Sequence, residues 1–157
     1  MKKTIKLTAL VLVALMLLFS LISCDTTSSS AGDETSQTGG VAERTGAWEN
    51  ATHVTDKEFG KGSKTVVVQV KAEGQMVTFT IKTDKKTVGE ALFEHDLIAG
   101  EEGAYGLYVK KVNGMVADYD ANQTYWAFYV NGEYGMAGVD MTEIDESATY
   151  KLELTKG

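Results

Sequence analysis

Apolar and polar side chains alternate along several stretches of the chain, most clearly over residues 76–82. There Val77, Phe79 and Ile81 are separated by polar residues, the period of two that is typical of a strand with one buried face. Residues 64–70 repeat the pattern with valines, and a short polar turn joins the two runs. The pattern predicts two antiparallel strands with one face turned to solvent.

The period changes at Thr87, which is followed three residues later by Glu90 in the spacing of a capping box. Apolar side chains then recur at helical spacing from Val88 to Ile98, and Gly100 is placed to end the helix. Because a helix of about ten residues is marginal in isolation, we expect it to be stabilised by packing on the sheet.

Three further strand-like runs cover residues 105–112, 125–131 and 148–154. An acidic turn around Glu101 precedes them, and the dipeptides Asn113-Gly114 and Asn131-Gly132 favour hairpin turns because both residue types tolerate a positive φ. The predicted order is therefore β-β-α-β-β-β. We expect an α+β domain, a β-grasp-like mixed sheet with one covering helix.

The beginning of the chain has a different pattern, in which three lysines precede an apolar run over residues 7–22. This arrangement is typical of a secretory signal, and the run is shorter than the roughly 20 residues that span a bilayer. It leads into Leu-Ile-Ser-Cys at 21–24, which resembles the lipobox of bacterial lipoproteins. The resemblance implies cleavage before Cys24 and lipid on its thiol. We expect an extracytoplasmic protein that is lipid-anchored to the bacterial cell membrane.

Residues 25–40 are rich in Ser, Thr and Gly and carry one alanine as their only apolar side chain, so they are expected to form a flexible tether. In residues 41–63, glycines interrupt any regular spacing of apolar side chains such as Trp48 and Phe59, so no secondary structure is assigned to that segment. The sequence thus divides into a signal peptide, 1–24, a tether with a transitional segment, 25–63, and a domain, 64–157.

The composition is ordinary for a soluble protein, with 43% hydrophobic and 24% charged residues and a net charge of -7. Loss of residues 1–24 removes three lysines and no acid, which leaves 12 basic against 22 acidic residues and a charge of -10. Nucleic acid is therefore excluded as a partner, because its binding depends on cationic side chains.

Four segments resemble a bacterial extracellular domain family described as transcobalamin C-terminal-like. They are TDKKTVGEAL at 83–92, YGLYV at 105–109, YWAFYVNGE at 125–133 and GVD at 138–140, and the resemblance covers about residues 64–156. In the animal carriers transcobalamin and intrinsic factor, the related domain closes over a cobalamin held mainly by a larger helical-barrel domain. The resemblance implies a corrinoid as the bound ligand.

Catalytic and metal chemistry find little support in the residues. His53 and His95 have no second histidine or thiolate at metal-ligand spacing, so no metal site is expected. No Gly-x-Ser-x-Gly motif is present, and we expect no enzyme. Asp118, Asp120 and Asn122 begin like a calcium loop, but the glycine and glutamate required later are missing, which favours an Asx-rich turn.

The candidate ligand-binding residues are aromatic or soft side chains near the last hairpin. Trp126, Phe128 and Val130 share one face of their strand and are expected in the core. We predict an amphipathic stacking surface made by Tyr119, Tyr125, Tyr129, Tyr134 and Met136. Ordinary sheet propensity accounts equally well for these tyrosines, and the alternative stays open here.

The sequence thus favours a non-catalytic binding domain on a lipoprotein, with a small flat ligand such as a corrinoid and no cofactor. The alternative is a protein-interaction or cell-envelope adhesion module that binds a protein partner and no small molecule.

Overall fold

The computed structural model describes residues 40–104 and 106–157 of the chain. The expected signal peptide, Cys24 and the tether up to residue 39 lie outside the described residues, as does Tyr105. The described residues belong to one compact unit, Ser36–Gly157. Within them, no helix has the length and apolar character needed to cross a membrane.

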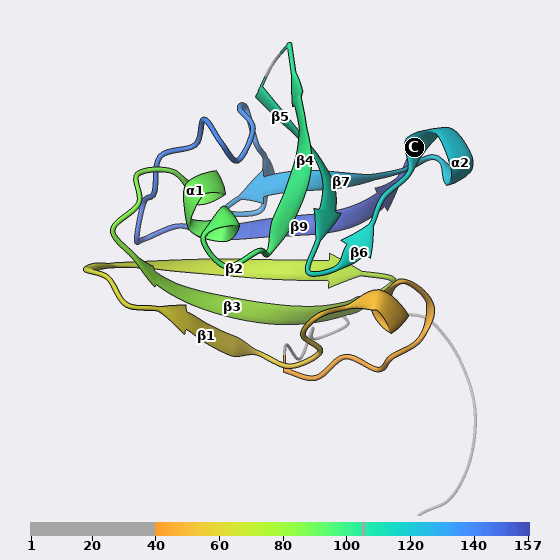
Figure 1. The fold of residues 1–157 in the computed structure, drawn as a ribbon, viewed down its shortest axis with the longest axis horizontal. Helices are drawn as coiled ribbons and strands as arrows, with labels where there is room; N and C mark the ends of the chain where they lie inside the picture. The colour runs from red at the N-terminus through yellow and green to blue at the C-terminus, as the bar shows by residue number, and fades with distance from the viewer. Residues whose placement is uncertain (1–39, 105) are drawn as a thin grey trace, which may run out of the picture. The chain divides into compact units, whose positions relative to one another are not determined.

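The larger of two sheets has six strands in the order β1-β3-β2-β9-β7-β8 (Figure 1). Its strands are β1 (Lys57–Gly60), β2 (Lys64–Ala72), β3 (Gln75–Thr83), β7 (Thr124–Val130), β8 (Glu133–Tyr134) and β9 (Thr149–Lys156). The sheet is mixed, because β1 pairs with β3 and β2 pairs with β9 in parallel while the other pairs are antiparallel. The predicted antiparallel pair of β2 and β3 is confirmed.

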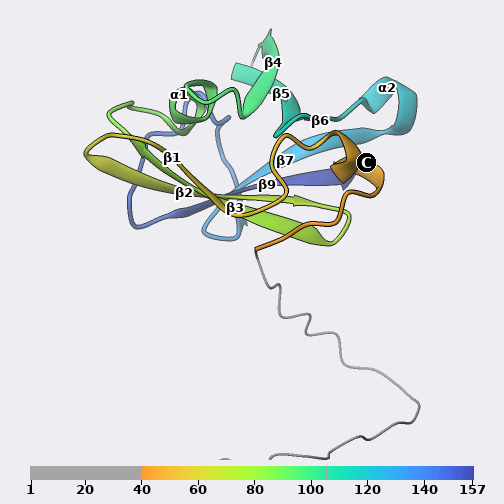
Figure 2. The same cartoon turned by 60° about the horizontal axis from the view of Figure 1, so that its bottom comes forward.

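A second, three-stranded antiparallel sheet consists of β4 (Ile98–Gly103), β5 (Gly106–Val112) and β6 (Met115–Val116). The helical segments are all short: η1 (Gly46–Asn50), α1 (Val88–Phe93) and α2 (Tyr119–Asn122). Figure 2 shows α1 and the three-stranded sheet on the same side of the six-stranded sheet.

The predicted α+β, β-grasp-like fold with one covering helix is wrong, since the protein is mostly β and has two sheets with only small helices. The capping box of Thr87 and Glu90 is confirmed, but α1 ends at Phe93. Asp96 then adopts a positive φ of 55°, and the chain reverses into β4. Ile98, which was expected near the end of the helix, and Glu101, which was expected in an acidic turn, both belong to β4. Together, β4 and α1 cover one face of the six-stranded sheet (Figure 2).

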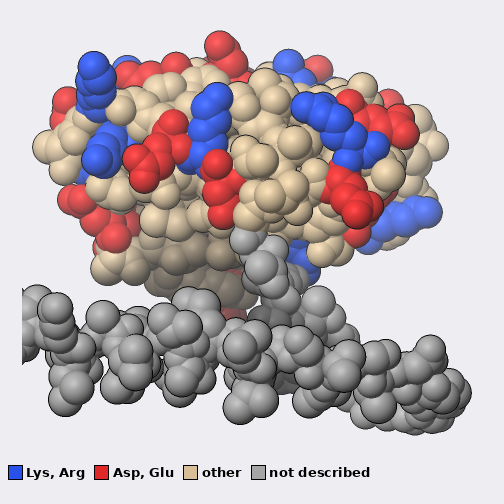
Figure 3. All heavy atoms as spheres, turned by 90° about the horizontal axis from the view of Figure 1, so that it is seen from below, with Lys and Arg blue, Asp and Glu red and all other residues tan. Residues whose placement is uncertain are grey.

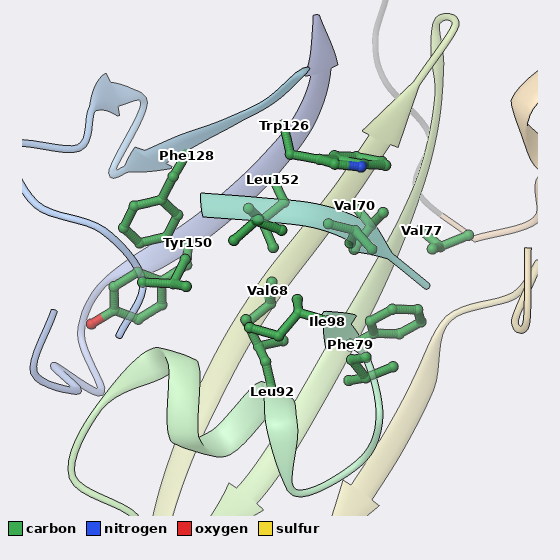
Figure 4. Close-up of a cluster of buried hydrophobic side chains, with 14 of the residues drawn as sticks. Val68, Val70, Val77, Phe79, Leu92, Ile98, Trp126, Phe128, Tyr150 and Leu152 are labelled. Carbon is green, nitrogen blue, oxygen red and sulfur yellow. The ribbon is translucent and has the colours of Figure 1, made fainter. Parts of the chain in front are cut away.

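The core lies between the two layers (Figure 4). From the six-stranded sheet it receives the inward side chains of β2, β3, β7 and β9, and Leu92, Ile98, Val112 and Met115 come from the covering layer. Burial of each large apolar side chain contributes roughly 1.5–3 kcal/mol, so this interface is the main source of stability.

The unassigned segment 41–63 is part of the folded unit. Trp48 is fully buried, and its indole N–H donates to the carbonyl of Ala72 at 2.9 Å. The side chain of Asn113 pairs with the backbone of His53 in both directions, at 2.9 and 2.7 Å. Because these contacts and β1 join the segment to both sheets, the folded unit extends well before residue 64.

Candidate functional site

Strand β7 presents different side chains to its two faces. Trp126 and Phe128 are only 7% and 8% exposed and lie opposite Leu154 and Leu152 of β9. Tyr125 and Tyr129 alternate with them and are half-buried on the other face of the sheet. The alternation predicted for this strand is therefore confirmed.

Two of the predicted ligand-binding tyrosines meet on that outer face. The rings of Tyr129 and Tyr134 lie edge to face with centroids 5.5 Å apart. The ammonium of Lys151, on β9, lies 4.2 Å from the centre of the Tyr129 ring. We call Tyr125, Tyr129 and Tyr134, together with Lys151 and Glu153, the tyrosine face.

An ion-pair network continues the tyrosine face along the sheet. Glu153 accepts from Lys151 at 2.6 Å and lies 3.1 Å from the ammonium of Lys71. Burial raises the pKa of Glu153, but the hydrogen bonds from the two lysines outweigh it and hold that pKa below its ordinary value. Because Lys151 covers Tyr129 and pairs with Glu153, a ligand stacking there would have to displace a contact that already exists.

The other predicted residues lie away from this pair. Tyr119 is on α2, which leads into the start of β7, whereas Tyr134 and Met136 follow its end (Figure 1). Met136 is fully exposed. The structure therefore brings together Tyr129 and Tyr134, places Tyr125 on the same face, and separates Tyr119 from them.

Tyr119 lines a cleft of about 420 Å³ between the three-stranded sheet and α2. The lining residues are Tyr108, Lys110, Val116, Ala117, Asp118, Tyr119 and Asp120, and we call this hollow the β5–α2 cleft. Tyr108, Val116 and Tyr119 are 45%, 64% and 52% exposed. Three of the large hydrophobic side chains that the fold leaves exposed thus lie around one hollow.

The hairpin of β5 and β6 forms one wall of the cleft, and the turn at Asn113-Gly114 joins its two strands. Both residues have positive φ, 50° and 85°, which confirms the predicted turn, and it brings β6 back alongside β5. After β6, the amide of Ala117 donates to the carbonyl of Lys110 at 2.8 Å, so residues 115–117 stay beside β5.

Helix α2 forms the other wall, and two contacts fix its ends. Asp118 is its N-cap and accepts from the amide of Ala121 at 2.9 Å. Gln123 ends it in the left-handed region at φ 60° and accepts a backbone bond from Gly157 at 2.8 Å. Gly157, which follows β9, also lies close to the Tyr119 ring.

Charge in the cleft is unevenly distributed. Lys110 forms an ion pair with Glu101 of β4 at 2.8 Å, and that hydrogen bond raises the pKa of Lys110. Asp118 and Asp120 lie on the opposite wall. A ligand in the cleft would meet two tyrosines, one paired ammonium and two carboxylates.

A second hollow, of about 310 Å³, lies at the β1 side of the six-stranded sheet. It is lined by Asp56, Lys57, Glu58, Thr78 and Thr80. Asp56 already accepts from the amide of Thr78 at 2.6 Å, and no aromatic side chain of the described residues lines this hollow. The β5–α2 cleft, which two tyrosines line, is therefore the better ligand site of the two.

Basic and acidic side chains are interspersed on the face of the molecule that Figure 3 shows.

Both histidines pack on the same aromatic ring. His53 and His95 have ring centroids 5.3 and 5.2 Å from that of Phe59 on β1. Burial, with a smaller contribution from the Lys57 charge, lowers the pKa of His53. Across residues 40–104 and 106–157, no group of three or more His, Cys, Asp or Glu side chains is arranged to hold a metal ion.

Sequence reasoning found Tyr119 but missed Tyr108, Lys110 and Val116. A usable signal was present, because Tyr108 and Lys110 flank the buried Val109 and therefore share the outer face of their strand. The Asn113-Gly114 turn then predicts that the following residues return along that strand. What the sequence did not show is that α2 lies opposite this hairpin.

The chain is similar to one family model and to several solved structures. Residues 85–155 match the family model described as a domain of unknown function (DUF4430). A structure from Ruminococcus gnavus ATCC 29149, provisionally described as a metal binding protein, is 32% identical over 60% of this chain and 99% of its own, with a TM-score of 0.57. No match is found among curated proteins.

The second structure is haptocorrin in complex with Cbi. It is 20% identical with a TM-score of 0.46, and the match covers 62% of this chain but 26% of haptocorrin. The predicted resemblance is thus confirmed only as far as a DUF4430 domain over residues 85–155. The likeness to haptocorrin carries no ligand over to this chain.

Proposed function

The chain belongs to the family of the Ruminococcus gnavus protein and of the DUF4430 domain, and on that premise we propose that it is a non-catalytic binding protein. Its ligand is a small, flat, partly apolar molecule such as a corrinoid, and it binds in the β5–α2 cleft. The observation that carries the proposal is the gathering of exposed Tyr108, Val116 and Tyr119 around one hollow.

The dimensions and lining of the cleft support this function. Its volume of about 420 Å³ lies within the range of about 300–1,000 Å³ that is common for small-molecule sites. Tyrosine rings offer an apolar face for stacking and a hydroxyl for hydrogen bonding. A cleft of this size accepts a small molecule whole, or one edge of a larger macrocycle.

A corrinoid also agrees with the description of the Ruminococcus gnavus protein as metal binding. Such a ligand brings its own cobalt ion and needs no cluster of protein ligands, and the described part of this chain contains none. The chain's contribution would be to hold the macrocycle and exclude water from one of its edges.

Binding is tested by titrating the unit Ser36–Gly157 with cobinamide and measuring tyrosine and tryptophan fluorescence, corrected for inner-filter loss. The core of this unit lies within it, between Ala42 and Leu152, and a thermal melt checks that it is folded. We expect saturable quenching. A response at millimolar cobinamide that equals the inner-filter loss alone would contradict the proposal.

We further propose that lipid on Cys24 attaches the protein to the outer surface of the cell membrane. The support is the apolar run that leads to the only cysteine of the chain. Two acyl chains or more suffice for stable attachment, at about 0.8 kcal/mol per buried methylene.

The attachment is tested in cells with an alkyne-tagged fatty acid. The wild-type chain should become labelled and sediment with membranes, whereas Cys24→Ser should stay unlabelled. Labelling of the Cys24→Ser variant would show that the lipid is elsewhere or that the label is unspecific.

The second candidate function is a protein-interaction or cell-envelope adhesion module, and the tyrosine face supports it. This surface lies on the side of the six-stranded sheet opposite the core. Cross-linking on intact cells separates the two functions, because recurrent capture of one protein through residues near Tyr129 would favour adhesion.

A further inference from the structure

The β5–α2 cleft is negatively charged overall. Among the residues that the structure describes, Lys110 is the one basic side chain in its lining, and its ammonium is paired with Glu101 at 2.8 Å. Asp118 and Asp120 line the facing wall, and neither takes part in the ion pairs found within the described ranges 40–104 and 106–157. The lining therefore carries one positive charge against two carboxylates, of which Asp118 also acts on the charge of Lys110.

The two aspartates are held differently. Asp118 uses one carboxylate oxygen to cap α2, where it accepts from the amide of Ala121 at 2.9 Å. Asp120 is in the first turn of α2 and is exposed at the rim of the cleft. Their negative charges act on the same hollow that the rings of Tyr108 and Tyr119 line.

We propose that the part of the ligand that enters this cleft is an organic cation, such as an alkylammonium or quaternary ammonium group. This inference rests on the proposed function, because it concerns the same cleft. The inference depends on the charges of Asp118 and Asp120 and on the rings of Tyr108 and Tyr119, all of which line the cleft.

Three properties of the lining favour an organic cation over other ligands. A cation over a tyrosine ring is attracted by the negative face of the ring, and the attraction grows as water is removed. Nearby carboxylates attract a cation through the Coulomb interaction. A neutral ligand lacks this attraction, and an anion is repelled. A bare metal ion gains little from tyrosine rings, since hard cations need several oxygen ligands at close range.

The test uses choline and 3,3-dimethyl-1-butanol, which have the same shape and differ in charge. Each is titrated into the isotope-labelled unit Ser36–Gly157 at low salt, and the amide shifts of residues 108–120 are followed. We expect choline to bind about tenfold more tightly than the neutral alcohol, and added salt to reduce the difference. Equal affinities would overturn the inference.

Two variants test which carboxylate produces the preference for choline. Asp120→Asn should reduce the preference for choline to about threefold or less, because it removes a carboxylate and keeps the side-chain shape. Glu133→Gln removes a carboxylate beyond the far end of β7 and should leave the preference at about tenfold. An unchanged preference in Asp120→Asn together with Asp118→Ser would overturn the role of these carboxylates.

Cobinamide, titrated in the same way, separates this inference from the proposed function. If cobinamide shifts residues 108–120 and choline binds no better than the alcohol, the cleft is a ligand site and the cationic class is wrong. If neither cobinamide nor choline shifts them at millimolar concentration, both proposals fail.

Discussion

The tyrosine face and the β5–α2 cleft both present tyrosine rings, but the rings have different neighbours. On the tyrosine face, Tyr129 has the ammonium of Lys151 over its ring and the edge of Tyr134 beside it. In the cleft, Tyr108 and Tyr119 border an open volume of about 420 Å³. The number of aromatic residues on a surface is thus a poor guide to binding, and what their rings already contact is a better one.

The two regions also differ in shape and in charge balance. On the tyrosine face, Glu153 lies between Lys71 and Lys151, so that its carboxylate is paired with two ammonium groups. The cleft has facing walls from separate elements and an excess of carboxylates. A surface whose charged groups are already paired suits a broad partner, whereas a concave one with an excess of carboxylates suits a small ligand.

The largest effect is expected from the core side of β7. Trp126→Ala should lower the free energy of unfolding by about 3–5 kcal/mol, because it leaves a cavity under a residue that is 7% exposed. Tyr125→Ala, one position away on the tyrosine face, should cost about 1 kcal/mol or less. Urea unfolding of both variants measures the contrast, and similar losses would show that Tyr125 belongs to the core.

The next effect concerns ligand binding. Replacing Tyr108 and Tyr119 together by Ala should weaken cobinamide binding by roughly tenfold to a hundredfold, since each ring contact is worth about 0.5–1.5 kcal/mol. The matched double variant Tyr125→Ala with Tyr129→Ala should change the dissociation constant less than threefold. Isothermal titration of the two double variants checks the contrast, and the reverse result would move the site to the tyrosine face.

A smaller effect should follow from loosening one wall of the cleft. Asp118→Ala removes the N-cap of α2 and should destabilise this short helix by about 1 kcal/mol, whereas Asp118→Ser keeps a capping oxygen. Hydrogen exchange at the amides of residues 119–123 should accelerate in the alanine variant only. Equal exchange in both variants would mean that the cap does not hold Tyr119 in place.

The smallest effect should come from the ion pairs of the tyrosine face. Folding lowers the pKa of Glu153 below its ordinary 4.5, so its contribution to stability is present above that pH and is lost as the pH falls through the folded pKa. Glu153→Gln should therefore be less stable than wild type by about 0.5 kcal/mol at pH 7. The gap should narrow below pH about 4.5, and a gap independent of pH from 7 to 3 would contradict this account.

Local patterns in the sequence predicted local structure well. The alternation in β2, β3 and β7, the capping box of Thr87 and Glu90, and the Asn-Gly turns all depend on residues close in the chain, and each is confirmed. The same alternation placed Tyr125 and Tyr129 on the outer face.

The second sheet could not be predicted in this way. Ile98 continues the helical spacing, and no alternation marks the glycines and glutamates of β4, whose pairing with β5 includes a bulge after Ala99. The docking of Trp48 and of His53 depends equally on distant partners, Ala72 for Trp48 and Asn113 for His53. The cleft was missed for the same reason, because its two walls meet only after both sheets have formed.

The central claim is that the ligand occupies the β5–α2 cleft and not the tyrosine face. The most direct measurement is a map of amide chemical-shift changes in Ser36–Gly157 on addition of cobinamide. The account predicts the largest changes at residues 108–120, with residues 125–134 and 151–153 changing little. Largest changes at 125–134 and 151–153 would contradict it.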